Sequence, residues 1–264
     1  MIEVLHSTAD VLRPEDVTGS VLICDPPYSP HVHQKMESSC AYESQARRRP
    51  AGFAPLTSEL RNHIAALGAQ CRWSVVCCDL EGIAAWRDAF AAQRGYRYIR
   101  AIPWVRWSMP QLSGDRPPSG AEAIVIAGPK GRMRWNGPGN LTHFDERCER
   151  GNDKHTTAKP LDLMLRLVSY FSDPGETVID PCCGRGTTIL AAKLLNRHGL
   201  GVECDATEAA LAQQRLVGEL SERDAERLTR YRTFAEREAV ELARIRAETD
   251  AIRVRKGLGP KGGK

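Results

Sequence analysis

Short apolar runs and helix-spaced apolar positions alternate along this chain. Runs of consecutive apolar residues, many of them β-branched, are typical of strands buried on both faces. Such runs predict seven strands, at 2–5, 21–24, 73–78, 98–105, 122–127, 177–179 and 199–202. Apolar positions at helical spacing predict helices at 57–67, 83–93, 159–171 and 189–195, and another after residue 203. Strands alternating with helices in this way indicate an α/β protein with an open sheet.

The strand at 21–24 ends abruptly in Asp25-Pro26-Pro27-Tyr28. Two prolines cannot continue a sheet ladder, and because they lack N–H groups they leave carbonyl oxygens free to accept other hydrogen bonds. Ligands bind at the carboxyl edge of open α/β sheets. A carboxylate and a fixed carbonyl there could receive both hydrogens of an amino group, and Tyr28 offers a flat face to a planar ring. The alternative is a plain strand-terminating turn.

A second strand exit, after 177–179, reads Asp180-Pro181-Cys182-Cys183-Gly184-Arg185-Gly186-Thr187-Thr188 and leads into a helix. Glycines let the backbone approach a ligand closely, and a helix N-terminus offers free N–H groups, so this pattern is typical of a cofactor cradle. The third glycine of a dinucleotide fingerprint is missing, which argues against a nicotinamide site. The next strand ends in Glu203, where an acid would hold a ribose hydroxyl pair.

Together these motifs resemble the amino-group DNA methyltransferases that use S-adenosylmethionine. The order is the permuted one of the β class, with Asp-Pro-Pro-Tyr before the cofactor motif, and the resemblance covers roughly residues 1–216. Residues 157–164 resemble the Lys-Pro-x-x-Leu segment, residues 180–188 the Asp-Pro-Phe-x-Gly-x-Gly-Thr-Thr motif, and residues 201–203 the Gly-x-Glu motif. The chain departs from the family at Cys182, where a phenylalanine is usual, and at Arg185, where a small residue is usual.

The resemblance implies a doubly wound, mostly parallel, seven-stranded methyltransferase-like sheet with a loop-rich target-recognition insert and a long C-terminal helix. The expected divisions are a catalytic domain at 1–217, made of a catalytic half at 1–105, the insert at 106–156 and a cofactor half at 157–217, then a helical extension at 218–257 and a disordered basic tail at 258–264.

The activity implied is transfer of a methyl group from S-adenosylmethionine to the N6 amino group of a flipped adenine in DNA, in the manner of restriction-modification enzymes. Cytosine N4 is the alternative target, although family members for cytosine more often begin the tetrapeptide with serine. An inactive DNA-binding or interaction module is the alternative from another class. Site residues carried over are, for catalysis, Asp25, Pro26, Pro27 and Tyr28, and, for the cofactor, Asp10, Lys159, Pro160, Asp180, Pro181, Cys182, Gly184, Gly186, Thr187, Thr188 and Glu203.

Charge adds a DNA-binding surface to this picture. The formal net charge is only +4, but a polyanion-binding protein needs a basic face rather than a large total. Basic and aromatic residues gather in two loop-rich stretches, and the predicted DNA contacts are Arg47, Arg48, Arg49, Trp107, Arg132, Arg134 and Trp135. A solvated patch in the first stretch and a plain linker in the second are the alternatives.

Composition excludes several other classes. With 264 residues, 42% hydrophobic and 27% charged, the chain is typical of a soluble globular protein, and no apolar run approaches the ~18 residues of a membrane span. The N-terminus has no signal-peptide layout, so a cytoplasmic location is expected. Nine scattered cysteines without a Cys-x-x-Cys pair are expected to be reduced. His31, His33 and Cys40 could in principle bind a metal, but none is expected.

Between Gly218 and Gly257 the chain contains neither glycine nor proline and is dense in Glu, Arg and Ala. Apolar residues there keep a heptad rhythm that breaks at Glu238 and Thr249. A broken heptad favours either a helix packed on its own domain or a short contact in a homodimer. The glycine- and lysine-rich tail is expected to be disordered.

Overall fold

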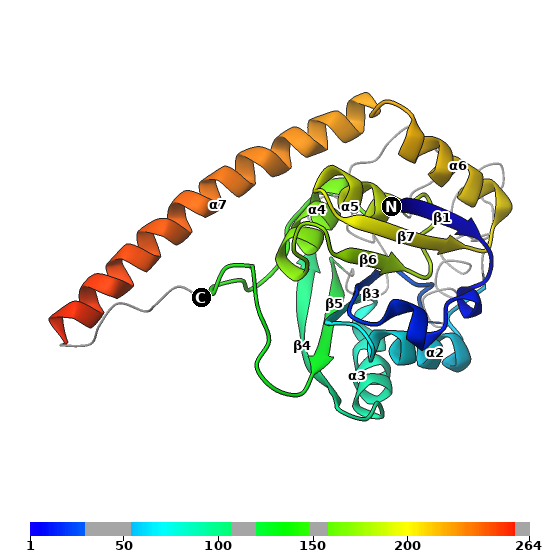
Figure 1. Cartoon of the computed structure of the whole chain (residues 1–264), viewed down its shortest axis with the longest axis horizontal. Helices are drawn as coiled ribbons and strands as arrows, with labels where there is room; N and C mark the ends of the chain where they lie inside the picture. Colours follow the sequence, from blue (N-terminus) through cyan, green and yellow to red (C-terminus); the bar gives the residue numbers. More distant parts are fainter. Residues whose placement is uncertain (30–53, 107–119, 148–157, 257–264) are drawn as a thin grey trace, which may run out of the picture.

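The computed structural model describes residues 1–29, 54–106, 120–147 and 158–256. Within them all seven predicted strands form and join one sheet, which confirms the predicted α/β architecture (Figure 1). The strands are β1 (Ile2–His6), β2 (Val21–Cys24), β3 (Trp73–Cys78), β4 (Tyr96–Val105), β5 (Ala121–Pro129), β6 (Thr177–Asp180) and β7 (His198–Glu203).

The sheet has the order β1-β7-β6-β2-β3-β5-β4. The first five strands in this order are parallel, β5 runs antiparallel to β3, and β4 runs antiparallel to β5. From β2 the chain continues to β3 on one side, whereas from β6 it continues to β7 on the other. The sheet therefore reverses its winding between β2 and β6, where Val21 pairs with Val178 and Leu22 with Ile179. Such a switch point is where open α/β sheets bind ligands.

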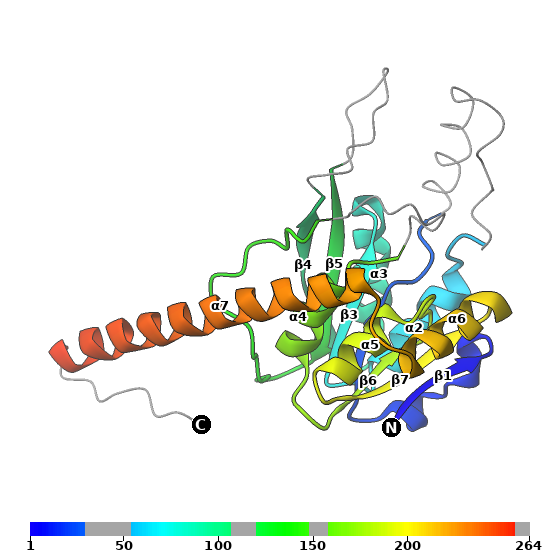
Figure 2. The same cartoon turned by 90° about the horizontal axis from the view of Figure 1, so that it is seen from above.

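Helices cover both faces of the sheet (Figures 1 and 2). Successive side chains of a strand point to opposite faces, so Leu22 and Cys24 join the core under α2 and α3, while Val21 and Ile23 join the core under α4 and α5. The helices are α2 (Ser58–Gly68), α3 (Ile83–Ala91), α4 (Leu161–Phe171), α5 (Thr187–Leu194), α6 (Ala206–Val217) and α7 (Glu222–Arg255), with short 3-10 helices at Ala9–Val11, Pro14–Val17 and Leu80–Gly82.

Side-chain caps fix where several helices begin. Thr57 accepts a hydrogen bond from the Leu60 N–H at 3.1 Å, which confirms the predicted start of α2. Ser221 caps α7 in the same way through the Asp224 N–H. Each cap satisfies a backbone donor that has no partner inside the helix.

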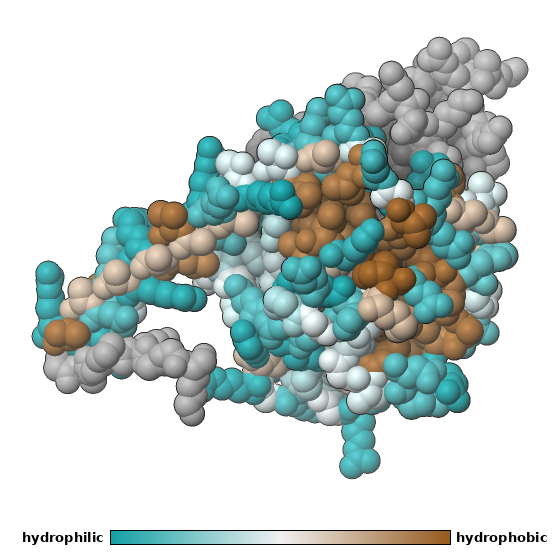
Figure 3. Space-filling view, turned by 45° about the horizontal axis from the view of Figure 1, so that its top comes forward, coloured by the Kyte–Doolittle hydropathy of each residue, from teal (hydrophilic) through white to brown (hydrophobic). Residues whose placement is uncertain are grey.

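The described contacts between helix α7 and the domain lie along its first half. Its buried Arg227 contacts Asp162 of α4 at 2.6 Å, and Glu238 accepts a hydrogen bond from Tyr170 at 2.5 Å. Beyond Glu238 the helix extends away from the sheet, and the hydrophobic residues that it exposes, among them Val240 and Ile252, are interspersed with hydrophilic ones (Figure 3). Of the two readings of the broken heptad, packing on the own domain is confirmed for the first half.

In the described ranges no helix is long and apolar enough to cross a membrane. The same ranges hold no group of three or more His, Cys, Asp or Glu residues arranged to bind a metal ion. His31, His33 and Cys40 lie outside the described residues.

We predict that Arg227→Met lowers the free energy of unfolding by about 3 kcal/mol in urea denaturation, because the Asp162 carboxylate stays buried without its main partner. Arg244→Met is the control, since Arg244 pairs with Glu241 and Glu248 on the exposed second half of α7. Exposed pairs contribute little, so the control should leave the midpoint unchanged. Equal effects of the two substitutions would contradict a docking role for Arg227.

Candidate active site

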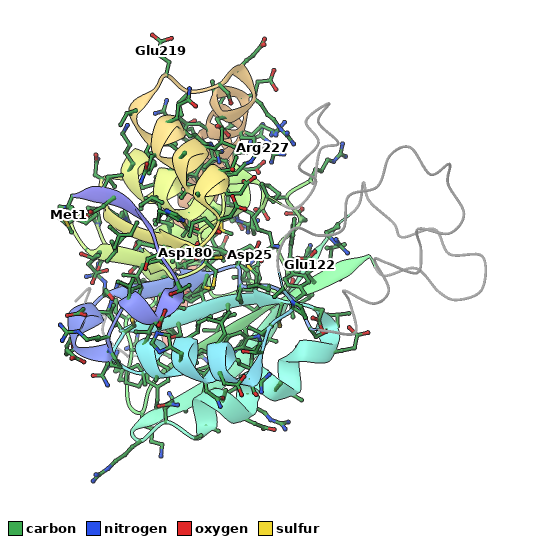
Figure 4. The ribbon with its side chains drawn as sticks, turned by 90° about the vertical axis from the view of Figure 1, so that its right-hand side faces the viewer. Met1, Asp25, Glu122, Asp180, Glu219 and Arg227 are labelled. Carbon is green, nitrogen blue, oxygen red and sulfur yellow. The ribbon has the colours of Figure 1, made fainter. Side chains whose placement is uncertain are left out.

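The carboxyl ends of the parallel strands bring acidic side chains together along one edge of the sheet. Asp25 follows β2, Asp180 ends β6 and Glu203 ends β7. Because β5 runs antiparallel, its first residues lie at the same edge and add Glu122. Figure 4 shows Asp180, Asp25 and Glu122 in a row along this edge.

Lys159 lies at the centre of the edge, next to Asp25. Its Nζ is 2.7 Å from Asp25 Oδ1, 2.8 Å from Asp25 Oδ2 and 2.9 Å from the hydroxyl oxygen of Tyr28. Glu122 Oε2 lies 3.3 Å from the same nitrogen and also accepts a hydrogen bond from the Tyr28 hydroxyl. Arg106 contacts the other oxygen of Glu122 at 2.8 Å. The resulting catalytic-edge cluster of Asp25, Tyr28, Arg106, Glu122 and Lys159 pairs two carboxylates with two cations.

Burial makes the charges of this cluster interact strongly. The Lys159 side chain is 7% exposed and that of Glu122 10%. Burial opposes the charged form of Lys159, but Asp25 and Glu122 outweigh it and raise the pKa of the ammonium. Burial likewise opposes the charged form of Glu122, but Lys159 and Arg106 hold its pKa below the ordinary value. Both groups are therefore ionised at neutral pH.

Asp25 and Tyr28 have pKa values shifted in the direction that burial dictates. Burial raises the pKa of Asp25, Lys159 opposes the shift, and Glu122 adds to it, so the pKa stays raised. Burial and the neighbouring Asp25 carboxylate raise the pKa of the Tyr28 phenol well above its ordinary value. Tyr28 therefore keeps its proton and donates it to the hydrogen bond with Glu122.

Asp25 retains one oxygen that accepts no hydrogen bond from any described residue. The Lys159 ammonium has hydrogen-bond geometry toward Oδ2, whereas Oδ1 is buried and has only the ionic contact at 2.7 Å. The Pro26 carbonyl likewise accepts no backbone N–H within the described ranges. The Pro26 carbonyl is therefore open to an N–H group from outside the chain, whereas Asp25 Oδ1 could accept one only after the ammonium moves away from it.

The backbone around Tyr28 is held by the neighbouring elements. The Tyr28 carbonyl accepts the Leu56 N–H at 3.0 Å, and the Ser29 N–H donates to Asp79 at 3.1 Å. A cavity of about 50 Å³ lies beside the Tyr28 ring, lined by residues that include Asp79 and Trp86. This volume has room for a few water molecules and is too small for a nucleobase.

The loop between β6 and α5 has the backbone that its glycines predict. Gly184 and Gly186 adopt φ of +50° and +70°, in the left-handed region that side chains with a Cβ disfavour. A Cβ on Gly184 would meet no atom within 4 Å, so the loop surface is open there. Glu203 accepts the Gly184 N–H at 2.8 Å through one oxygen and the Asp205 N–H at 2.9 Å through the other. Glu203 thus ties the loop to the end of β7.

Several predicted cofactor residues are buried beneath this loop and do not line its open surface. Asp180 is 1% exposed and accepts the Cys182 N–H at 3.1 Å. Pro181, Thr187 and Thr188 are buried as well. Cys182 and Gly184 are the predicted members of this loop that remain partly exposed.

The remaining predicted cofactor residues lie in two places. Asp10 is exposed just beyond β1, whose last residue pairs with Glu203, and its hydrogen bond from Thr8 lowers the pKa of its carboxyl. Lys159, predicted to contact the cofactor, has its ammonium against Asp25. Pro160 precedes α4 and accepts the Met164 N–H through its carbonyl.

Three of the predicted DNA contacts do not lie near this site. Because β5 runs away from the catalytic edge, Arg132, Arg134 and Trp135 follow it at the opposite edge of the sheet. There the Arg134 carbonyl accepts the indole N–H of Trp73, and the Trp135 ring packs on Phe171 with centroids 5.1 Å apart. All three residues are exposed, so a DNA contact by them stays a prediction, at a surface away from the catalytic edge. Arg47, Arg48, Arg49 and Trp107 lie outside the described residues.

Sequence reasoning missed Glu122, Arg106 and Trp104. Trp104 is buried, donates its indole N–H to the Glu146 carbonyl at 2.9 Å, and has the Lys159 ammonium 5.7 Å from its ring centroid. A glutamate at the start of an otherwise apolar strand was a usable signal. It points to the catalytic edge only once β5 is known to be antiparallel.

Comparisons with known sequences agree with this geometry. Residues 138–214 match the family model N6_N4_Mtase, described as DNA methylase. The match covers α4 to α6 and the glycine loop, and it does not reach Asp25. Type II methyltransferase M.HpaI of Haemophilus parainfluenzae is 33% identical over 91 residues, which are 34% of this chain and 29% of that protein. The chain spans less than a third of the length of the curated relatives that it matches.

Solved structures resemble the chain over most of its length. The complex of M1.HpyAVI with SAM superposes with a TM-score of 0.59 at 24% identity, covering 83% of this chain and 100% of that one. PvuII DNA methyltransferase, described as cytosine-N4-specific, gives a TM-score of 0.57 at 12% identity, covering 87% and 91%. At such identities the likeness shows that the chain shares the fold of these enzymes.

We predict that Asp180→Asn becomes relatively more stable as the pH rises. Burial raises the pKa of the Asp180 carboxyl to about 7, against the opposing bonds from Thr188 and the Cys182 N–H. A carboxyl whose folded-state pKa is raised stabilises the fold below its unfolded pKa, and that contribution is lost as the pH rises through about 7. The asparagine cannot ionise, so any thermal-stability deficit of the variant should shrink by several degrees between about pH 5 and about pH 8. A pH-independent difference in melting temperature would contradict the raised pKa.

Proposed function

We propose that this protein is a DNA methyltransferase that transfers a methyl group from S-adenosylmethionine to the N6 amino group of adenine. The observation that carries the proposal is the pairing of β2 with β6. This pairing supports the proposal because the exits of both strands, with Asp25 and Pro26 after one and the glycine loop after the other, then belong to one switch point of the sheet. The matches to DNA methylases support the same reaction class.

The residues at the glycine loop fit S-adenosylmethionine. The open surface at Gly184 lets a ligand approach the backbone, and Glu203 carries its carboxylate at the end of β7, where a ribose hydroxyl pair would be held. Cys182 stands where the family usually has a phenylalanine, so it does not supply that residue's aromatic contact to the cofactor. When bound, S-adenosylmethionine supplies an electrophilic methyl group together with its own leaving group, so no metal is needed.

The chain's part in the reaction is to make an amino nitrogen nucleophilic. The lone pair of an adenine amino group is delocalised into the ring. When Asp25 and the Pro26 carbonyl each accept one amino hydrogen, the nitrogen becomes more tetrahedral and its lone pair points at the incoming methyl group. Acceptors held where positive charge develops stabilise the transition state by electrostatic preorganisation.

A base inside a duplex cannot reach this edge, so the target base must be flipped out of the helix. Tyr28 follows Asp25 by three residues, and its ring would replace the stacking that the base loses. DNA contacts are assigned to the predicted residues Arg47, Arg48, Arg49 and Trp107.

Adenine is favoured over cytosine N4 because the tetrapeptide begins with Asp25. The N4-specific PvuII enzyme shares the fold, so fold alone does not separate the two targets. Sequencing that maps methylated bases in DNA from cells expressing the chain tests base, position and recognition sequence together. Methylated cytosine would replace the adenine proposal, and unmodified DNA would favour an inactive binding module.

We expect Asp25→Asn to slow methyl transfer by about two orders of magnitude while leaving the dissociation constant for S-adenosylmethionine near normal. The substitution removes the charge of one acceptor, and losing such a partner typically costs ~3 kcal/mol of barrier. Transfer of tritiated methyl groups to DNA measures the first quantity, and calorimetric titration the second. Transfer at the wild-type rate would remove Asp25 from the mechanism.

We expect Glu203→Gln to weaken S-adenosylmethionine binding at least tenfold, or about 1.4 kcal/mol. Glutamine keeps an oxygen acceptor for the Gly184 N–H, so the loop should survive while the paired acceptor for a diol is lost. Glu208→Gln is the control, because Glu208 pairs with Arg185 on the outer side of the same loop. An unchanged titration for the Glu203 variant would contradict a ribose contact.

A further inference from the structure

The Lys159 ammonium contacts both oxygens of Asp25, although the proposed mechanism needs an Asp25 oxygen that is free to accept an amino hydrogen. It has three hydrogens and four oxygens within reach, two on Asp25 and one each on Tyr28 and Glu122. Its shortest contacts are the two to Asp25. With the ammonium in this position, the charge of the Asp25 carboxylate is already neutralised by a cation of the chain itself.

This placement conflicts with methyl transfer in two ways. A carboxylate paired with an ammonium accepts a further N–H more weakly. The amino nitrogen also gains positive charge as the methyl group arrives, and a cation less than 3 Å from its acceptor would repel that charge. The ammonium must therefore move off Asp25 when an amino group enters, and in a buried site it needs another anion to move to.

Glu122 has the position and the charge to receive it. Its Oε2 is 3.3 Å from Nζ, and Glu122 is the second of the two carboxylates in the catalytic-edge cluster, the first being Asp25. Arg106 fixes the opposite oxygen at 2.8 Å, and the Tyr28 hydroxyl bonds to Oε2. A small shift of a flexible lysine side chain is enough to exchange one carboxylate for the other, because both already lie within ion-pair distance.

We propose that Glu122 is a positioning residue that draws the Lys159 ammonium away from Asp25 and holds the Tyr28 hydroxyl, so that Asp25 can accept an amino hydrogen. The inference rests on the proposed function and deepens it. Glu122 touches neither the base nor the methyl donor in this role. It acts through Lys159 and Tyr28, and its charge matters as well as its size.

The test is a comparison of Glu122→Gln and Glu122→Asp with the wild type in steady-state methyl transfer to DNA. Glutamine keeps the size and loses the charge, whereas aspartate keeps the charge at a shorter reach. We expect the glutamine variant to lose about tenfold or more in kcat, with the KM for DNA and the dissociation constant for S-adenosylmethionine within about threefold. The aspartate variant should retain clearly more activity than the glutamine variant.

Glu146→Gln is the matched control. The Glu146 side chain is 8% exposed and ion-paired like that of Glu122, but its partner is Arg166. We expect the control to lower the melting temperature about as much as Glu122→Gln while leaving kcat unchanged.

Four outcomes would overturn the proposal. A kcat for Glu122→Gln within twofold of the wild type would show that the charge is not needed. Equal losses in the glutamine and aspartate variants, or a loss matched by weaker cofactor binding, would indicate packing alone. A wild-type protein that transfers no methyl group to DNA would overturn the proposed function, and with it this role, so the two failures are distinguishable.

Discussion

The pairing of β2 with β6 is the constraint on which the site depends. The two strands are more than 150 residues apart in the sequence, yet Leu22 and Ile179 lie side by side in the sheet. Each strand ends in an acid followed by proline, and neither exit could form a shared site alone. Because the sheet reverses its winding at this pair, the described crossover helices lead away from it on both sides, and two strand exits of different chemistry meet there.

The sequence predicted what depends on local pattern. Apolar runs located every strand, Thr57 located the start of α2, and the glycines marked the loop after β6. It could not predict what depends on distant pairing. Glu122 reaches the site only because β5 runs antiparallel, and Trp135 leaves it for the same reason. The Lys-Pro motif singled out Lys159 in the sequence. Which side chains surround its ammonium could not be predicted, because the cluster combines four chain segments that come together only in the folded protein.

The electrostatics of the edge follow from burial as much as from charge. Asp25 and Glu122 would repel each other in a medium of low dielectric constant, and Lys159 and Arg106 balance them. Asp180 has no such cation among its described contacts, and its pKa is correspondingly raised by burial to about 7. Burial raises the pKa of both the Asp25 and the Asp180 carboxyl, but only at Asp25 does a neighbouring cation, Lys159, oppose the shift.

Helix α7 is linked to the catalytic edge through α4, although most of the helix lies far from that edge. Lys159 stands two residues before α4, so its position depends on how the start of α4 is held. Asp162, in the first turn of α4, is buried against Arg227 of α7. This buried ion pair therefore holds the start of α4, next to the residue that carries the ammonium. The first half of α7 therefore supports the start of α4 beside Lys159, whereas no described contact joins its second half to this arrangement.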